Sequence, residues 1–222
     1  MSKQKPAGAP AAGTITLNAR MIKASNTAMS SETRFPGNGG DAGEVTIIVS
    51  DSLTMDRGTL ETSTAGEGKA GDINLTVSVL ELHKGAAISS KSTSEESGGD
   101  AGIITVIAGD SIKLREKSCL TTDARGAGGG KIFVNAGNLI YLSNGKVTSS
   151  VRKGAGNGGD ITTDSEFVVL NNSSVKANAT EGDGGAIFIH TGTYIKSSES
   201  SVTATSERGN DGIVKIDAPN ID

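Results

Sequence analysis

The sequence is poor in the residues that usually build a compact core. Of its 222 residues only 3% are aromatic, with four Phe, two Tyr and no Trp, and Cys119 is the single cysteine. Aromatic side chains normally supply much of the buried area of a core. A chain of this length must therefore bury a thin core of Ile, Val and Leu, or stay disordered. One cysteine also excludes an internal disulfide.

Excess positive charge and long apolar runs are absent as well. Lys and Arg number 21 against 25 Asp and Glu, and the net charge of −4 argues against a nucleic-acid partner. No apolar run approaches the ~18 residues of a membrane span. The first ten residues lack the apolar stretch of a secretory signal. The sequence as it stands therefore predicts no nucleic-acid binding, no membrane span and no export signal.

Small residues are abundant instead, and they recur with a period. The chain has 31 Gly, 26 Ser and 22 Thr. Short apolar alternations follow the glycine clusters, and their first residues lie 26 to 31 positions apart, with a mean of about 28. Period-two alternation is typical of a strand with one buried face. These segments are Ile15–Leu17, Val45–Ile47, Ile73–Leu75, Ile104–Val106, Ile132–Val134, Ile161–Thr163, Ile187–Ile189 and Val214–Ile216.

Each unit contains two further predicted strands. The second begins seven to ten residues after the first, at Leu53–Met55, Leu80–Leu82, Ile112–Leu114, Ile140–Leu142, Val168–Leu170 and Ile195. The third is centred on one aliphatic residue, namely Met29, Leu60, Ile88, Leu120, Val147, Val175 or Val202. A turn such as Arg57-Gly58 or Asn144-Gly145 precedes the third strand, and a glycine-rich loop follows it.

Three strands and three corners in tandem describe one turn of a parallel β-helix. No stretch of ten residues has the 3.6-residue period of a helix, which argues against a βαβ array. We therefore predict an all-β, right-handed parallel β-helix of about seven coils of ~28 residues with three strands per coil. Residues 1–12 are expected to form a flexible Pro/Ala-rich lead-in, and residues 13–222 a single β-helix repeat domain.

The acids of the glycine-rich loops are the first candidates for chemistry. Parallel β-helices also host polysaccharide lyases and hydrolases, which need two or three close carboxylates. The loop position four residues before each first strand holds Asp41, Lys69, Asp100, Gly128, Asn157, Asp183 and Asn210, and the position one residue before holds Glu44, Asp72, Ile103, Lys131, Asp160, Ala186 and Ile213. Neither column stacks acids on adjacent coils, so Asx-turns at the corners are the simpler expectation. Weak calcium binding at Asp41, Asp100 and Asp160 is left open.

The other reactive side chains are far apart in the predicted stack. His83 and His190 fall four coils apart, which excludes a shared metal, and both are expected at the surface. Cys119 precedes an inward leucine, so alternation places it outward or at a corner. Tyr141 and Tyr194 are the aromatic residues on which a sugar ring could stack. Phe133 and Phe188 are expected to face outward.

Hydroxyl residues follow the aliphatic residue of the third strand in most units. They are Thr62-Ser-Thr64, Ser89-Ser90, Thr121-Thr122, Thr148-Ser149 and Thr203-Ala-Thr205. We expect them to stack into a flat Thr/Ser face on the outside of the rod. Such a face suits hydration of an outer sheet, with ice binding as a distant alternative.

The repeat resembles the filamentous haemagglutinin-like exoproteins of bacterial two-partner secretion. The resemblance rests on units such as Gly71–Leu75 with Leu80–Ile88, and on Gly156–Ile161, and it extends over residues 13–222. It implies a right-handed β-helical shaft of a large secreted or cell-surface adhesin. The Asn-Pro-Asn-Gly type motif of the family's secretion domain and an Arg-Gly-Asp triplet do not occur in this sequence. No binding or catalytic residue is therefore carried over from the family.

The sequence thus favours a non-catalytic shaft segment, with no catalytic residue, no cofactor and no metal ligand assigned. Its expected partners are a host or neighbouring cell surface or glycans, reached through the parent adhesin, together with end-to-end self-association. The expected location is extracellular or at the cell surface. A polysaccharide-active β-helix enzyme, and a truncated adhesin fragment without independent function, remain the alternatives.

Overall fold

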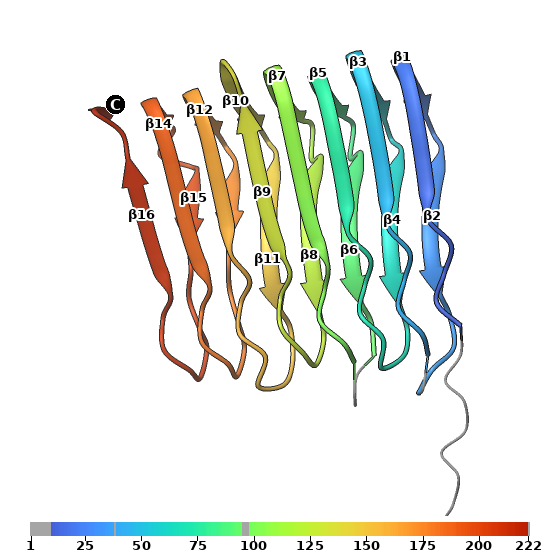
Figure 1. The fold of residues 1–222 in the computed structure, drawn as a ribbon. Coiled ribbons are helices and arrows are strands. Elements are labelled where there is room, and N and C mark those ends of the chain that lie inside the picture. Colours follow the sequence, from blue (N-terminus) through green and yellow to red (C-terminus); the bar gives the residue numbers. More distant parts are fainter. Residues whose placement is uncertain (1–9, 38, 95–97, 222) are drawn as a thin grey trace, which may run out of the picture.

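The chain winds into a stack of similar coils, here called turns, and the strands of successive turns form two parallel sheets. The computed structural model describes residues 10–37, 39–94 and 98–221, so most of the predicted lead-in, residues 1–9, lies outside the described residues. The described residues form strands and no helix, and every strand pair is parallel. Figure 1 shows the turns side by side, with β1 and β16 at opposite ends of the stack. This is the predicted parallel β-helix.

The larger sheet has ten strands and the smaller sheet has seven. The larger one contains β1 (Ile15–Ser25), β3 (Val45–Asp56), β5 (Ile73–His83), β7 (Ile103–Arg115), β9 (Lys131–Ala136), β10 (Leu139–Ser143), β12 (Ile161–Asn171), β14 (Ala186–Lys196), β16 (Ile213–Asp217) and β17 (Asn220–Ile221). The smaller one contains β2 (Ala28–Thr33), β4 (Thr59–Thr64), β6 (Ala87–Ser92), β8 (Cys119–Ala124), β11 (Lys146–Val151), β13 (Ser174–Lys176) and β15 (Ser201–Thr203).

The first and second predicted strands of a turn are mostly one continuous strand. They run together in β1, β3, β5, β7, β12 and β14, and they are separate as β9 and β10 and, in the last turn, as β16 and β17. The pairing register shifts at the corner between the two halves, for example between Val49 and Ser52. A bulge bends a strand without ending it. Most turns therefore have two strands, one of them bent, instead of three.

The corner between the two sheets is made by residues with left-handed backbone conformations. Asn26, Arg57, Lys84, Asn144 and Asn172 have φ between 45° and 54°. Asparagine adopts this region at little cost, whereas arginine and lysine are strained in it. Glu116 (φ 53°) makes the same corner in a sixth turn, whereas the corner between β14 and β15 has no residue in this region. Where the corner does recur, the stacking of neighbouring turns imposes the conformation even on residues that do not favour it.

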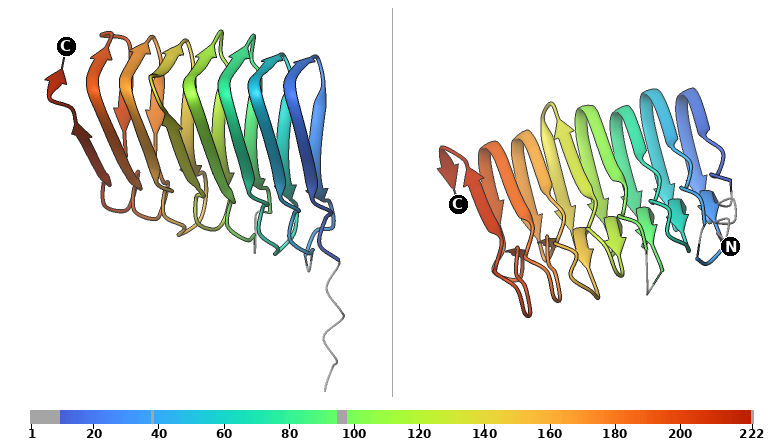
Figure 2. Two further views of the ribbon diagram at one scale, coloured as in Figure 1. Left: turned by 45° about the horizontal axis from the view of Figure 1, so that its top comes forward. Right: turned by 60° about the horizontal axis from the view of Figure 1, so that its bottom comes forward.

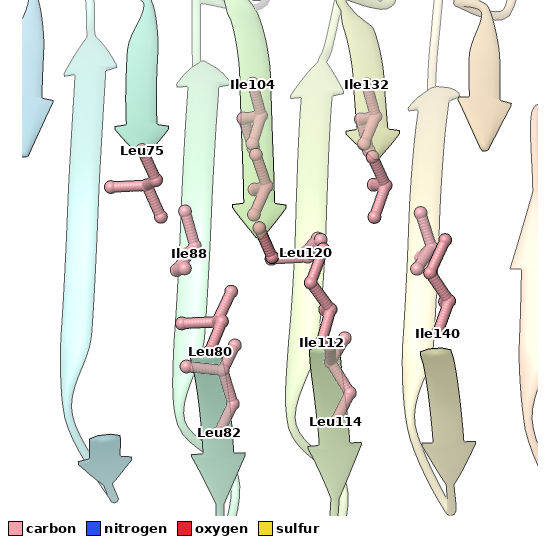
Figure 3. Packing of buried hydrophobic residues seen from close by; sticks show 14 of the residues in the cluster. Leu75, Leu80, Leu82, Ile88, Ile104, Ile112, Leu114, Leu120, Ile132 and Ile140 are labelled. Atoms are coloured by element: carbon pink, nitrogen blue, oxygen red, sulfur yellow. The ribbon is translucent and has the colours of Figure 1, made fainter. Parts of the chain in front are cut away.

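The predicted aliphatic columns fill the interior. The first column pairs Ile15, Val45, Ile73, Ile104, Ile132, Ile161, Ile187 and Val214 across neighbouring turns. The third column, from Met29 to Val202, is confirmed in the same way. Figure 3 shows some of them, including Ile88, Leu120 and Ile132, lying between the two sheets. The buried side chains form one continuous cluster along the axis. Burial of such side chains is worth about 1.5–3 kcal/mol each, so the stacked turns share the stabilisation that one turn lacks.

The prediction for the end of the second column was wrong. Tyr194, and not Ile195, pairs with Val168 and lies inside, where it is 3% exposed, while Ile195 is 39% exposed. The distance from the first aliphatic column to the second is seven residues in this turn, from Ile187 to Tyr194, and eight in others, such as Val45 to Leu53. The bulge absorbs this difference, so spacing alone could not place the residue.

The expected Thr/Ser face on the outside was also wrong in part. Thr62, Ser90, Thr122 and Ser149 are fully buried, because they lie two residues after the inward aliphatic of the third strand. Ser89 lies on the outward side but is also fully buried, and it donates to Glu61 Oε2 at 3.0 Å. The other outward neighbours form a mixed surface that includes the ion pair between Lys91 and Glu61, 2.7 Å apart.

The buried hydroxyls join the smaller sheet to the glycine that precedes each long strand. Ser90 Oγ donates to the carbonyl oxygen of Gly71 at 2.9 Å and accepts from the amide of Gly102 at 2.8 Å. Ser149 Oγ donates to the carbonyl oxygen of Gly130 at 2.6 Å. Polar groups that are buried without a partner destabilise a fold. The inward hydroxyls therefore satisfy the backbone where the loop enters the core.

Candidate functional site

The loop acids bridge consecutive turns. The amide of Lys69 donates to Asp41 Oδ1 at 2.7 Å, the amide of Gly128 donates to Asp100 Oδ1 at 2.8 Å, and the amide of Asn210 donates to Asp183 Oδ1 at 2.8 Å. The donor belongs to the following turn in each case. The predicted register of this column is therefore right, but the side chains hold the next turn instead of closing a local Asx-turn.

The second loop column behaves in the same way. Asp72 Oδ1 accepts from the amide of Ile103 at 2.7 Å, and Asp160 Oδ1 accepts from the amide of Ala186 at 3.3 Å. Lys131 also lies 3.2 Å from Asp160. Asp72 and Asp160 thus accept hydrogen bonds from the first amides of β7 and β14, which have no backbone partner there. These contacts give the loop acids a structural role.

A groove lined by charged side chains, alanines and glycines lies along these loops. It has a volume of about 340 Å³, and its charged lining residues are Lys69, Asp72, Asp100 and Lys131. Among the described residues, no three His, Cys, Asp or Glu side chains are close enough together to hold a metal ion. The groove therefore contains two lysines and two aspartates that come from three consecutive turns. One oxygen of each aspartate already accepts a hydrogen bond from a backbone amide.

A second hollow, on the outer face of the larger sheet, brings together groups that the sequence reasoning missed. It has a volume of about 320 Å³ and lies where the long strands bend. Asn135, Asp164, His190 and Asp217 occupy one outward column in four consecutive turns. Neighbouring parallel strands are ~4.8 Å apart, so these side chains form a continuous polar ladder.

Hydrogen-bond contacts join the first two and the last two side chains of this ladder. Asn135 Nδ2 lies 3.5 Å from Asp164 Oδ2, and His190 Nδ1 lies 3.2 Å from Asp217 Oδ2. The side chains of His190 and Asp217 are 68% and 66% exposed. Glu166 and Thr191 border the same hollow. His190 therefore lies between Asp164 and Asp217 in the column, and its exposed imidazole is open to hydrogen bonding with a polar ligand.

The sequence did contain a signal for this ladder. Asp164, His190 and Asp217 each follow the first aliphatic residue of their turn by three positions, at Ile161, Ile187 and Val214. The predicted acid columns lay only in the loops, before the strands. The same repeat of about 28 residues identifies this outward column when the fourth residue of each strand, counted from its first aliphatic residue, is compared between turns.

The remaining candidate residues are dispersed. His83 is half-buried, with Nε2 3.8 Å from Glu81, and lies far along the stack from His190. Cys119 is half-buried on the outer side of β8, and burial raises the pKa of its thiol. Lys91 and Lys146 oppose this shift more weakly. A raised pKa lowers the thiolate population and hence the reactivity of the thiol.

The aromatic residues divide between the surface and the core. Phe133 and Phe188 are each 41% exposed on the outer face of the larger sheet, as predicted. Tyr141 is half-buried, and the guanidinium of Arg115 lies 5.6 Å from its ring centroid. Tyr194 is buried, and its hydroxyl has no hydrogen-bond partner. Burial raises the pKa of Tyr194 to about 12. Tyr194 is therefore not available to stack on a sugar.

Comparisons with the models of known protein families, with curated proteins and with solved structures found no match to this chain. Within the part of the chain that the structure describes, no helix has the length and apolar character needed to cross a membrane. The fold and the outer surface are therefore the observations on which a function can be proposed.

Proposed function

We propose that this chain is a structural shaft segment of a filamentous haemagglutinin-like adhesin that is secreted or held at the cell surface of a bacterium. The supporting observation is the continuity of the stack. One apolar cluster runs from the first turn to the last, two parallel sheets flank it, and loop acids such as Asp41 and Asp100 bond their turn to the next. Such a stack transmits force along its axis and presents its outward side chains on a rigid support.

The outward surface suits contact with a cell surface or with glycans. Figure 2 shows the glycine-rich loops gathered along one edge of the stack, where their length and course differ from turn to turn. Loops on a rigid scaffold carry recognition in many folds. In this proposal the parent adhesin supplies export, and the present chain supplies length and a contact surface.

The location of the chain in its own cells tests this proposal. Antibodies raised against the purified chain are applied to intact cells, before and after treatment with an external protease. We expect labelling of intact cells or of the culture medium, and loss of the cell-bound label after protease. A cytoplasmic enzyme is probed in parallel as a control for lysis. Labelling that requires permeabilised cells would contradict the proposal and would favour the fragment alternative.

A polysaccharide-active enzyme is the second candidate, and the outer hollow is the observation that favours it. Asp164, Glu166 and His190 line an open surface that could accommodate a chain of sugars. Most glycoside hydrolases cleave the glycosidic bond with a pair of carboxyl groups. The chain is incubated with pectin and related polymers, and new reducing or unsaturated ends are measured. Activity that is lost in Asp164→Asn and Glu166→Gln, but kept in Asp51→Asn on another turn, would support the enzyme over the shaft.

A further inference from the structure

Two exposed phenylalanines share one outward column of the larger sheet. Phe133 on β9 and Phe188 on β14 both pair with Thr162 on β12, so they lie two turns apart on one line. Neighbouring strands are ~4.8 Å apart, which puts the two positions roughly 10 Å from each other along the stack axis. Each phenylalanine is 41% exposed, and the side chain between them is the smaller threonine. We call this line the ring column.

Exposed aliphatic side chains gather beside one end of the ring column. The direct partner of Phe133 on β7 is Thr105, and the outward residues on either side of that threonine are Ile103 and Ile107. These two isoleucines are 36% and 48% exposed. Each lies one strand across from Phe133 and two residues along, which is within reach of a large side chain. The outer face thus has an apolar strip that extends from β7 to β14.

The polar ladder runs parallel to the ring column. Each member of the ladder follows a member of the ring column by two residues, as Asn135 follows Phe133 and His190 follows Phe188. Two residues along a strand are ~6.6 Å, so the two columns lie side by side. Asparagine and histidine both donate and accept hydrogen bonds, whereas the ladder carboxylates only accept them. The face therefore combines exposed rings on one line with mixed hydrogen-bonding groups on the next.

A sugar has the matching arrangement of groups. Its ring presents apolar C–H bonds on its faces, which stack on aromatic rings, and hydroxyl groups at its edge, which donate and accept. An acidic glycan would bring carboxylates close to Asp164, Glu166 and Asp217. A cationic glycan would meet Lys215, which pairs with Phe188 at the end of the ring column. The charges of the face therefore favour an uncharged glycan, and its straight columns favour an extended one.

We propose that this face binds an extended, uncharged glycan that lies along the stack axis, with sugar rings on Phe133 and Phe188 and hydroxyl groups on the polar ladder. Every second unit of an extended β-linked glucan presents the same face, and two units span about the distance between the two phenylalanines. This inference rests on the proposed function, in which the outward surface meets glycans, and it names the site and the class of glycan.

Isothermal titration calorimetry of the full chain tests the class of ligand. The probes are cellohexaose and N-acetylchitohexaose, which are extended and uncharged, and we expect saturable binding of at least one of them. Maltohexaose consists of the same units as cellohexaose in a curved chain, and it should bind at least about tenfold more weakly. An oligogalacturonate of the same length should not bind. Absence of binding by both extended probes, or tighter binding of either control, would overturn the proposal.

Variants of the ring column test the position of the site. Phe133→Ser and Phe188→Ser should each weaken binding by roughly three- to tenfold and leave the unfolding midpoint unchanged, because both rings are exposed. Ile48→Ser is the matched control, because Ile48 is 48% exposed on the same outer face but lies on β3, three turns from β9. Unchanged affinity in both phenylalanine variants, or an equal loss in Ile48→Ser, would refute the assignment.

This experiment is independent of the test of the shaft proposal. Binding by the purified chain does not depend on where the chain is located in its cells. Surface labelling without glycan binding would therefore overturn this site and leave the shaft proposal standing. Glycan binding by a chain that is labelled only in permeabilised cells would have the opposite meaning.

Discussion

Replacing Ser149 by alanine should destabilise the protein far more than its small size suggests. Ser149 is fully buried, donates to the carbonyl oxygen of Gly130 at 2.6 Å and accepts from Thr122 Oγ1 at 2.8 Å. The alanine variant loses both hydrogen bonds and leaves the Thr122 hydroxyl buried without its acceptor. Two lost bonds at ~1 kcal/mol each, plus ~1–2 kcal/mol for the orphaned hydroxyl, predict a loss of about 3–4 kcal/mol.

Urea unfolding followed by far-UV circular dichroism measures this loss. Ser150→Ala, one residue further and on the outward side of the same strand, is the matched control and should change the free energy of unfolding by less than ~0.5 kcal/mol. In a Thr122→Val background the Ser149→Ala cost should fall by at least ~1 kcal/mol, because no hydroxyl is then orphaned.

A small effect of Ser149→Ala would refute this reasoning, and the chain itself suggests how that could happen. In the next two turns alanines occupy the same column. There the amide of Gly185 donates to the carbonyl oxygen of Ala177 at 2.8 Å, and the amide of Gly212 donates to that of Ala204 at 2.6 Å. If the Ser149→Ala variant adopted this backbone contact, its stability would equal that of Ser150→Ala. The hydroxyls would then be interchangeable with a backbone bond.

Three further predictions follow from individual side chains. Tyr194→Phe should leave the protein equally stable or stabilise it by up to ~1 kcal/mol in thermal unfolding, because the buried hydroxyl has no partner to lose. Cys119 should react with iodoacetamide at pH 8 much more slowly in the native protein than in urea, because burial raises the pKa of its thiol. The hydrogen bond from Lys113 lowers the pKa of Glu81, so this carboxylate stabilises the fold above its unfolded pKa of ~4.3 and stops doing so as the pH falls through the lower folded value. The stability difference between wild type and Glu81→Gln should therefore be largest near neutral pH and shrink below pH ~4, and a difference independent of pH would contradict this assignment.

The inward columns of the fold could be predicted because a solenoid repeats its contacts at a fixed period. Each residue from Ile15 to Val214 in the first column pairs with the residue that the spacing assigns to it. The period could not place Tyr194, because the bulge between the strand halves lets the spacing vary by one residue. A local change of one residue reverses which side chain is buried.

The hydroxyl residues were misplaced for a different reason. Strict alternation from Leu120 puts Thr121 outward and Thr122 inward, which is what the structure shows. Their polarity suggested instead that both lay outside. A polar residue inside a β-helix is favourable only where a backbone group needs a partner, and the glycine carbonyls that provide this need lie far away in the sequence, as Gly71 does from Ser90.

The same contacts explain the composition of the chain. Turns that approach as closely as Gly130 and Gly102 exclude side chains at the loop junction, and the adjacent hydroxyls must be small to reach the carbonyls. Among the described residues Tyr194 is the one buried aromatic, and it leaves an unbonded hydroxyl in the core. Glycine, serine, threonine and the loop acids are therefore largely occupied in holding turns together. Side chains that face solvent lie on the outward columns of the strands, such as the ladder through Asp164 and His190. In a β-helix of this kind the outward columns are therefore the better candidates for function, because the abundant loop acids hold neighbouring turns together.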